Sequence, residues 1–266
     1  MLTYLSLGLA IGVILALTGA GGGILAVPTL VFGAQQSVAQ AGPVGLLAVG
    51  MAAALGAVLG LRAGTVRYRA ALLIAAVGML LSPLGLWLAQ RIDNRWLSLV
   101  FALVLIFVAY RTYRQASDAP VRAATVEKVA PPCVRDADTG RFRWTAPCAR
   151  ALALSGAGAG VLSGLLGVGG GFVMVPALCR YTNLPMQSVV ATSLAVIALV
   201  STTGVVSSAV AGTLNWAVAM PFSAGALFGM AGGRLIAARL AGPLLQKGFA
   251  LVSAMVAIGM ISRAVD

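Results

Sequence analysis

Thr18-Gly19-Ala20-Gly21-Gly22-Gly23 interrupts the first apolar stretch of the sequence, and Gly167-Val168-Gly169-Gly170-Gly171 interrupts a later stretch in the same way. The two stretches are residues 2–33 and 149–180, and each is longer than the roughly 20 residues that one helix needs to cross a bilayer. Glycine costs about 1 kcal/mol relative to alanine inside a helix, so each cluster is expected to open its helix. Each stretch is therefore predicted to form two half-helices joined by an unwound turn.

The rest of the chain is also rich in long apolar segments. Hydrophobic residues make up 60% of the 266 residues and charged residues 9%, against roughly 25% charged residues in a soluble domain. The apolar runs do not alternate in polarity, as the strands of an outer-membrane barrel would. The unbroken segments are 39–61, 68–90, 95–113, 187–210, 216–238 and 243–262. We therefore expect an all-α polytopic membrane protein, multi-pass, in a bacterial inner membrane.

The two halves of the chain match each other at a constant offset of 148 residues. The offset pairs both glycine clusters, and it also pairs residues far from them. These pairs are Pro28 with Pro176, Gly64-Thr65 with Gly212-Thr213, Arg91 with Arg239, and Phe101-Ala102-Leu103 with Phe249-Ala250-Leu251. Such a constant shift indicates internal duplication, which is typical of secondary transporters. The predicted organisation is a first transmembrane repeat at 1–113, a polar linker at 114–148 and a second repeat at 149–266.

The linker is the one long polar stretch of the sequence, and we expect it to be solvated and partly disordered. Two of the three cysteines, Cys133 and Cys148, lie in it, and the third is Cys179. Their number is odd, no Cys-x-x-Cys is present and the chain has no histidine, so no zinc or haem site is expected. All three cysteines are interpreted as reduced, and no metal or cofactor is predicted.

The positive charges discriminate between two topologies. If each glycine-broken segment crosses the membrane, the halves are parallel and the 18 basic residues divide into 12 and 6 between the two sides. If each segment is re-entrant, each half adds three full spans, the halves are inverted, and the basic residues divide into 15 and 3. The positive-inside rule favours the second division, which places the linker in the cytoplasm.

The glycine breaks are the strongest functional signal. A half-helix that begins at membrane depth presents free N–H groups and a positive dipole end, and two such ends facing each other form a site for an anion. The predicted substrate-binding residues at the breaks are Thr18, Gly21, Gly22, Gly23, Gly169, Gly170 and Gly171. The alternative is that these glycines only permit close helix packing.

A stripe of hydroxyl groups in the second half is the next signal. Thr192, Ser193 and Thr203 are predicted to donate hydrogen bonds to substrate oxygens, with hydrogen bonding between helices as the alternative. The matching stretch 41–44 of the first half has no hydroxyl, so the site is expected to be asymmetric. Arg234, inside an apolar run, is a further candidate ligand, with a snorkelling residue near a span end as the alternative.

The acidic residues argue against an enzyme and against a proton relay. All six lie in loops or at the terminus, so no buried carboxylate, catalytic pair or triad is available. The net charge of +12 is interpreted as basic span ends that meet membrane lipid, and no nucleic-acid partner is expected.

The motifs Gly-Ala-Gly-Gly-Gly-x4-Pro at 19–28 and Gly-Val-Gly-Gly-Gly-x4-Pro at 167–176 resemble the paired signature of the TauE/SafE sulfite exporter family. The segments Ala191-Thr192-Ser193-Leu194 and 233–240 are similar to its later motifs. The resemblance covers nearly the whole chain except the linker. It implies movement of sulfite, sulfoacetate or a related sulfur-containing anion, generally outward.

The expected function is therefore a secondary transporter that exports a small organic or inorganic anion. The alternatives are a cation-coupled uptake permease for such anions and a non-transporting membrane scaffold. A homo-oligomer is compatible with the sequence.

Overall fold

The computed structural model describes residues 1–122, 133, 145–240 and 243–265. Its elements are α1 (Leu2–Thr18), the 3₁₀ helix η1 (Gly19–Leu25), α2 (Ala26–Gly33), α3 (Val38–Arg62), α4 (Tyr68–Arg91), α5 (Asn94–Arg122), α6 (Ala146–Leu166), α7 (Gly171–Tyr181), α8 (Met186–Val210), α9 (Trp216–Leu240) and α10 (Pro243–Val265). Within the described residues, five helices are long and apolar enough to cross a membrane: α3, α4, α5 up to Arg114, α6 and α8. The predicted all-helical, multi-pass fold class is confirmed at this level.

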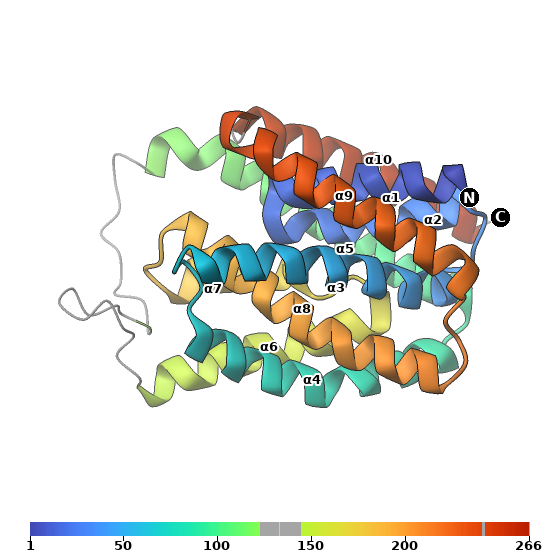
Figure 1. Cartoon of the computed structure of the whole chain (residues 1–266), viewed down its shortest axis with the longest axis horizontal. Helices are drawn as coiled ribbons and strands as arrows, with labels where there is room; N and C mark the ends of the chain where they lie inside the picture. Colours follow the sequence, from blue (N-terminus) through green and yellow to red (C-terminus); the bar gives the residue numbers. More distant parts are fainter. Residues whose placement is uncertain (123–132, 134–144, 241–242, 266) are drawn as a thin grey trace.

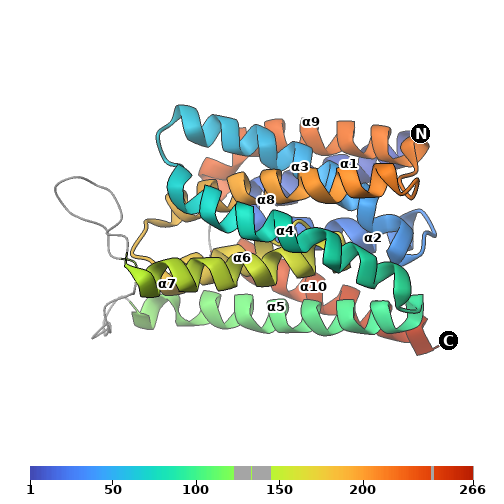
Figure 2. The ribbon, with the colours of Figure 1, turned by 90° about the horizontal axis from the view of Figure 1, so that it is seen from below.

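The path of the chain defines two ends of the helix bundle. The start of α1 and the end of α10 lie at one end, here called the terminal end, and the end of α5 and the start of α6 lie at the other, here called the linker end (Figure 1). Figures 1 and 2 show α1 running inward from the terminal end and α2 returning to it, while α6 and α7 do the same from the linker end. At the terminal end, the backbone N–H of Val38 donates to Asn94 Oδ1 over 2.9 Å and ties the start of α3 to the start of α5.

The helices α3 and α8 form the centre of the bundle. In an apolar stretch of 18 residues within each helix, 56% of the stretch is buried in α3 and 61% in α8, against 33–39% in α4, α5 and α6. The two helices pack against each other, α3 also packs on α9, and α8 also packs on α4. Any segment that ends between α3 and α8 is therefore at the middle of the protein.

Glycines let two outer helix pairs approach to backbone contact. In the pair α1–α9, a methyl group on Gly8 would overlap the Phe222 carbonyl, and one on Gly12 would overlap the Ala226 carbonyl. In the pair α4–α6, a methyl group on Gly160 would overlap the backbone of Gly78. Small residues at four-residue spacing produce such close packing in membranes. Each pair joins a helix from one half of the chain to a helix from the other half, as Figures 1 and 2 show.

The matched residues at the ends of α3 and α8 adopt the same geometry. Gly64 and Gly212, at φ +66° and +67°, follow the two helices and supply a left-handed conformation that other residues rarely adopt. The hydroxyl of Thr65 donates to the Gly60 carbonyl, and that of Thr213 to the Ser208 carbonyl, at 3.0 Å and 3.1 Å. The offset of 148 residues in sequence thus corresponds to one helix-ending motif used twice.

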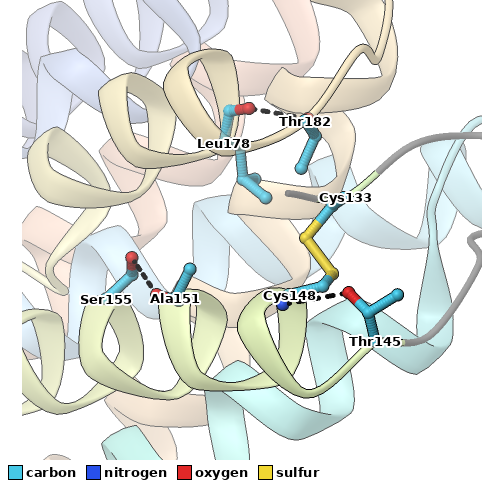
Figure 3. Close-up of a disulfide and its surroundings, with 7 residues drawn as sticks. All are labelled: Cys133, Thr145, Cys148, Ala151, Ser155, Leu178 and Thr182. Carbon is cyan, nitrogen blue, oxygen red and sulfur yellow. Dashed lines mark hydrogen bonds between the residues drawn. A yellow bond between two sulfur atoms is a disulfide. The ribbon is translucent and has the colours of Figure 1, made fainter. Parts of the chain in front are cut away.

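A disulfide bond joins the chain between α5 and α6 to the first turn of α6. Cys133 and Cys148 are bonded, with their Cα atoms 4.9 Å apart (Figure 3). The interpretation of all cysteines as reduced is therefore wrong for these two, because the fold brings Cys133 back over α6; Cys179 remains a free thiol. The Cys133 N–H also donates to the Tyr181 carbonyl over 3.1 Å, so the same residue contacts the end of α7. The rest of the predicted linker lies mostly outside the described residues.

Candidate functional site

The two glycine breaks have different backbone conformations. In the second break, Gly167, Gly169 and Gly170 have φ values of +70°, +74° and +68°, which form a left-handed turn between α6 and α7. In the first break, the chain continues as the 3₁₀ helix η1, and the Ala26 N–H donates to the Gly23 carbonyl where α2 begins. The predicted unwound turn is therefore wrong for the first break, because its glycines keep a helical hydrogen-bonding pattern.

The two breaks meet between α3 and α8, at the centre of the bundle. A Cβ atom on Gly23 would lie 3.0 Å from Val49 Cγ1 and 3.1 Å from the Val168 carbonyl oxygen. A Cβ atom on Gly169 would lie 2.8 Å from Ile197 Cγ2 and 3.2 Å from Ser201 Oγ. Val49 contacts both positions, so the two breaks face each other at Gly23 and Gly169. A methyl group on Gly23 would be tightly packed, and one on Gly169 would overlap Ile197 and strain a left-handed backbone.

The other predicted glycines have different surroundings. A Cβ atom on Gly22 would lie 2.6 Å from the Leu15 backbone nitrogen, and one on Gly170 would lie 2.6 Å from the Ala159 carbonyl oxygen. Both therefore hold a returning segment against its own preceding helix, as the packing alternative requires. Gly171 is buried and begins α7, whereas the surroundings of Gly21 in η1 lie outside the described residues.

The predicted threonines all have backbone partners. Thr18 donates to the Ile14 carbonyl over 2.7 Å, and Thr203 donates to the Val200 carbonyl over 2.8 Å. Thr192 Oγ1 accepts the Arg67 N–H over 3.1 Å and ties α8 to the turn between α3 and α4. Thr18 and Thr203 therefore use their O–H groups within their own helices. Thr192 only accepts and keeps its O–H, but its partner is the backbone at the start of α4 and not a glycine break.

Two serines of α8 are different. Ser193 and Ser201 are 0% and 1% exposed, and neither hydroxyl has a hydrogen-bond partner. They lie four residues before and four residues after Ile197, so the three share one stripe of α8. Ile197 and Ser201 both contact Gly169, which places this stripe against the second break. A buried hydroxyl without a partner costs about 1–3 kcal/mol, so such groups need an explanation in ligand binding or in packing.

Sequence reasoning missed two more hydroxyls beside the second break. Ser163 of α6 and Ser82 of α4 are fully buried and have no hydrogen-bond partner. The Ser163 carbonyl accepts the Gly167 N–H over 2.9 Å, at the start of the turn, and Ser82 Oγ lies 3.5 Å from where a Cβ atom on Gly204 would be. Their position in apolar runs, with Ser163 four residues before Gly167, was the available signal.

Arg234 does not lie at the breaks. Its Nη1 donates to the Gly56 carbonyl of α3 over 3.0 Å, in the part of α3 that approaches the linker end. This geometry agrees with the alternative of a charged side chain that reaches from an apolar helix toward the membrane boundary.

The second break has the chemistry of an uncharged anion site. Gly170 precedes α7 and provides no side-chain cap, so the N–H groups of the first turn keep the positive end of an 11-residue helix. The Ser201 hydroxyl, which has no partner, adds a donor beside Gly169 of the same break. Helix N-termini and hydroxyls bind oxyanions without a fixed positive charge. Within the described residues no group of three His, Cys, Asp or Glu side chains is placed to hold a metal ion.

Apolar spanning helices with broken segments that end at the centre of the bundle define a membrane transporter. The family model for the sulfite exporter TauE/SafE matches residues 4–260, and the chain belongs to this family. The resemblance that the two glycine motifs carry is thereby confirmed.

Two relatives illustrate the similarity. A probable membrane transporter protein of Xylella fastidiosa strain Temecula1 is 30% identical over 257 residues, covering 95% of this chain and 92% of the relative. The probable membrane transporter protein YunE of Bacillus subtilis is 30% identical over 236 residues, covering 84% and 83%. No solved structure matches the chain.

Proposed function

We propose that this protein is a secondary transporter that exports a small sulfur-containing anion, such as sulfite, sulfoacetate or a related sulfonate, across a bacterial inner membrane. The observation that carries the proposal is the second break at the centre of the bundle, where the unpartnered hydroxyl of Ser201 lies against Gly169, two residues before the start of α7. The substrate would accept hydrogen bonds from the first turn of α7 and from Ser201, with Ser163, whose carbonyl accepts the Gly167 N–H, on α6 before the break. The membership of the family supports the substrate class.

The proposed topology is an inverted pair of repeats. The path of the chain supports it, because α1–α2 and α6–α7 are hairpins that enter from opposite ends of the bundle. Of the 14 basic residues that the structure describes, 11 belong to the linker end and three, Arg91, Arg95 and Arg263, to the terminal end. The positive-inside rule then places the linker end in the cytoplasm.

The export direction follows from the membrane potential. When an anion leaves a negative cell interior, its free energy falls by about 2.3 kcal/mol per charge per 100 mV, so export needs no coupling ion. The absence of acidic residues from the apolar segments of the sequence fits this simple mechanism. Since Val49 and Ile197 close the space around Gly23 and Gly169, transport requires α3 and α8 to separate at this point.

Flux in proteoliposomes tests the proposal. We expect vesicles loaded with sulfite or sulfoacetate to lose the anion when the outside is made positive and to retain it when the potential is reversed. Vesicles that lack the protein are the control, and sulfate is included to test selectivity. Strict dependence on a sodium gradient would favour coupled uptake, and no flux of any anion would favour a scaffold.

A further inference from the structure

A cavity of about 520 Å³ lies between α5, α6 and α7, and Ser201 is not among the residues that line it. Its inner wall is apolar and includes Phe172 and Leu162. Toward the linker end, its wall carries two arginines, Arg111 from α5 and Arg180 from α7, together with Tyr181. The volume is many times the roughly 30 Å³ of one water molecule, so the cavity is larger than a small oxyanion needs.

The cavity opens toward the lipid rather than toward the middle of the bundle. Three of its lining side chains are largely exposed: Leu103 at 69%, Phe107 at 57% and Leu154 at 73%. Large apolar side chains on the outer face of a spanning helix contact acyl chains. An occupant can therefore enter sideways from the bilayer, with its apolar part between α5 and α6.

The arginines give the cavity a charge that the described part of the chain does not neutralise. Neither Arg111 nor Arg180 takes part in a hydrogen bond or ion pair within the described residues. The hydroxyl of Ser155, also in the wall, donates to the Ala151 carbonyl over 2.7 Å. Two guanidinium groups at the headgroup level attract one anionic group.

The equivalent place between α2 and α10 is filled. At the offset of 148, Arg180 corresponds to Phe32 and Arg111 to Gly259. A Cβ atom on Gly259 would lie 3.1 Å from Cζ of Phe32, so the phenylalanine ring occupies the space against α10. The crevice beside the α6–α7 hairpin thus has two arginines where the equivalent place beside the α1–α2 hairpin has a phenylalanine ring and a glycine, and the open crevice does not follow from packing alone.

We infer that the crevice between α5, α6 and α7 binds one anionic phospholipid, with an acyl chain along Phe172 and Leu162 and the phosphate at Arg111 and Arg180. Basic pockets between membrane helices at the cytoplasmic side hold anionic headgroups. The lipid joins α5 to the α6–α7 hairpin, which lack extensive direct contact with each other. The inference needs only a membrane-embedded protein and does not depend on the anion transported or on its direction.

Native mass spectrometry of the full chain with added lipid tests the inference. We expect dioleoylphosphatidylglycerol to remain bound at one copy and dioleoylphosphatidylcholine to dissociate. Each of Arg111→Gln and Arg180→Gln is expected to weaken retention by about fivefold, because one basic residue near an anionic surface contributes about 1 kcal/mol. Arg69→Gln, an exposed arginine at the same end of the bundle, is the matched control and is expected to leave retention unchanged.

A second variant introduces the residues of the equivalent place between α2 and α10, a phenylalanine and a glycine. Arg180→Phe combined with Arg111→Gly should close the crevice, keep the protein folded and abolish retention of phosphatidylglycerol. Equal retention of both lipids would overturn the inference, and so would unchanged retention in a variant that combines Arg111→Gln with Arg180→Gln. Stabilisation of the protein by glycerol 1-phosphate as strong as that by the whole lipid would also overturn it, since the occupant would then be a soluble anion. A dimer that the two arginine variants disrupt would overturn it as well.

Discussion

At the scale of the residue, Ser201 is the position where structure and proposed function meet most closely. It is 1% exposed, its hydroxyl has no partner, and it faces Gly169 of the second break. A buried serine can bond to a carbonyl of its own helix, as Ser208 does to Gly204 over 2.7 Å, but Ser201 does not. A substrate oxygen would supply the missing acceptor.

Ser201→Ala is therefore expected to weaken transport without weakening the fold. A hydrogen bond to a charged group contributes about 1.5–3 kcal/mol, so substrate affinity should fall roughly 10- to 150-fold. Removal of an unpaired buried hydroxyl should leave the thermal midpoint unchanged or slightly raised. Flux against substrate concentration and thermal unfolding in detergent provide the two measurements.

Ser253→Ala is the matched control, because Ser253 is equally buried and equally without a partner but lies in α10. We expect it to transport normally. Normal affinity in Ser201→Ala, or an equal loss in both variants, would remove Ser201 from the site.

At the scale of the element, the helix pair α4–α6 depends on the absence of side chains along one face of α6. Gly160 faces the backbone of Gly78, whereas a Cβ atom on Gly158 would meet nothing within 4 Å. The same helix therefore contains a glycine that packing requires and a glycine that packing does not require.

Gly160→Ala is expected to separate α4 from α6 and to lower stability by about 1–3 kcal/mol, as overpacking of a close contact does. Gly158→Ala should be neutral or slightly stabilising, because alanine favours the helix. The folded yield after detergent extraction and the thermal midpoint of the two variants are compared. Equal behaviour of the two would show that α4 and α6 do not approach at Gly160.

The elements also show what could be predicted from the sequence and what could not. Hydropathy and the repeat located the spans within a few residues, and 39–61 became α3 at Val38–Arg62. The conformation of the breaks was less accessible, because glycine permits both a left-handed turn and a 3₁₀ helix, and only tertiary packing selects between them. The disulfide depends on the path of the linker, which hydropathy does not report. The unpartnered serines depend on which face of each helix is buried.

At the scale of the whole molecule, the arrangement of the two ends makes a prediction about topology. Asp93→Cys at the terminal end should react with a membrane-impermeant maleimide in intact cells, and Ala63→Cys at the linker end should not. Both positions are exposed, and Cys179→Ser removes the free native thiol from the background. Asp93 is preferred to Asn94, whose side chain bonds to the start of α3. The reverse labelling pattern would contradict the proposed orientation.

The disulfide provides an independent reading of the same orientation. The structure has Cys133 and Cys148 bonded, whereas a cytoplasm keeps thiols reduced. The proposed cytoplasmic linker end therefore predicts that the pair is a dithiol in growing cells and that the bond forms only after purification in air. Alkylation of whole cells with a permeant maleimide before lysis should then add two labels relative to the oxidised protein. Failure to add them would place the linker end in an oxidising compartment.

The pairing of α1 with α9 has a consequence for biosynthesis. The glycine face of α1, with Gly8 and Gly12, finds its partner backbone only in α9, which begins about 200 residues after α1 ends. At the roughly 5–20 residues per second of translation, α1 waits about 10–40 s in the membrane before α9 is available. By contrast, α6 meets α4 as soon as it is inserted, because α4 precedes it in the chain. The nascent protein therefore completes the packing of the α6–α7 hairpin before that of the α1–α2 hairpin. A chain that stops before α9 leaves the glycine face of α1 without the helix it packs against.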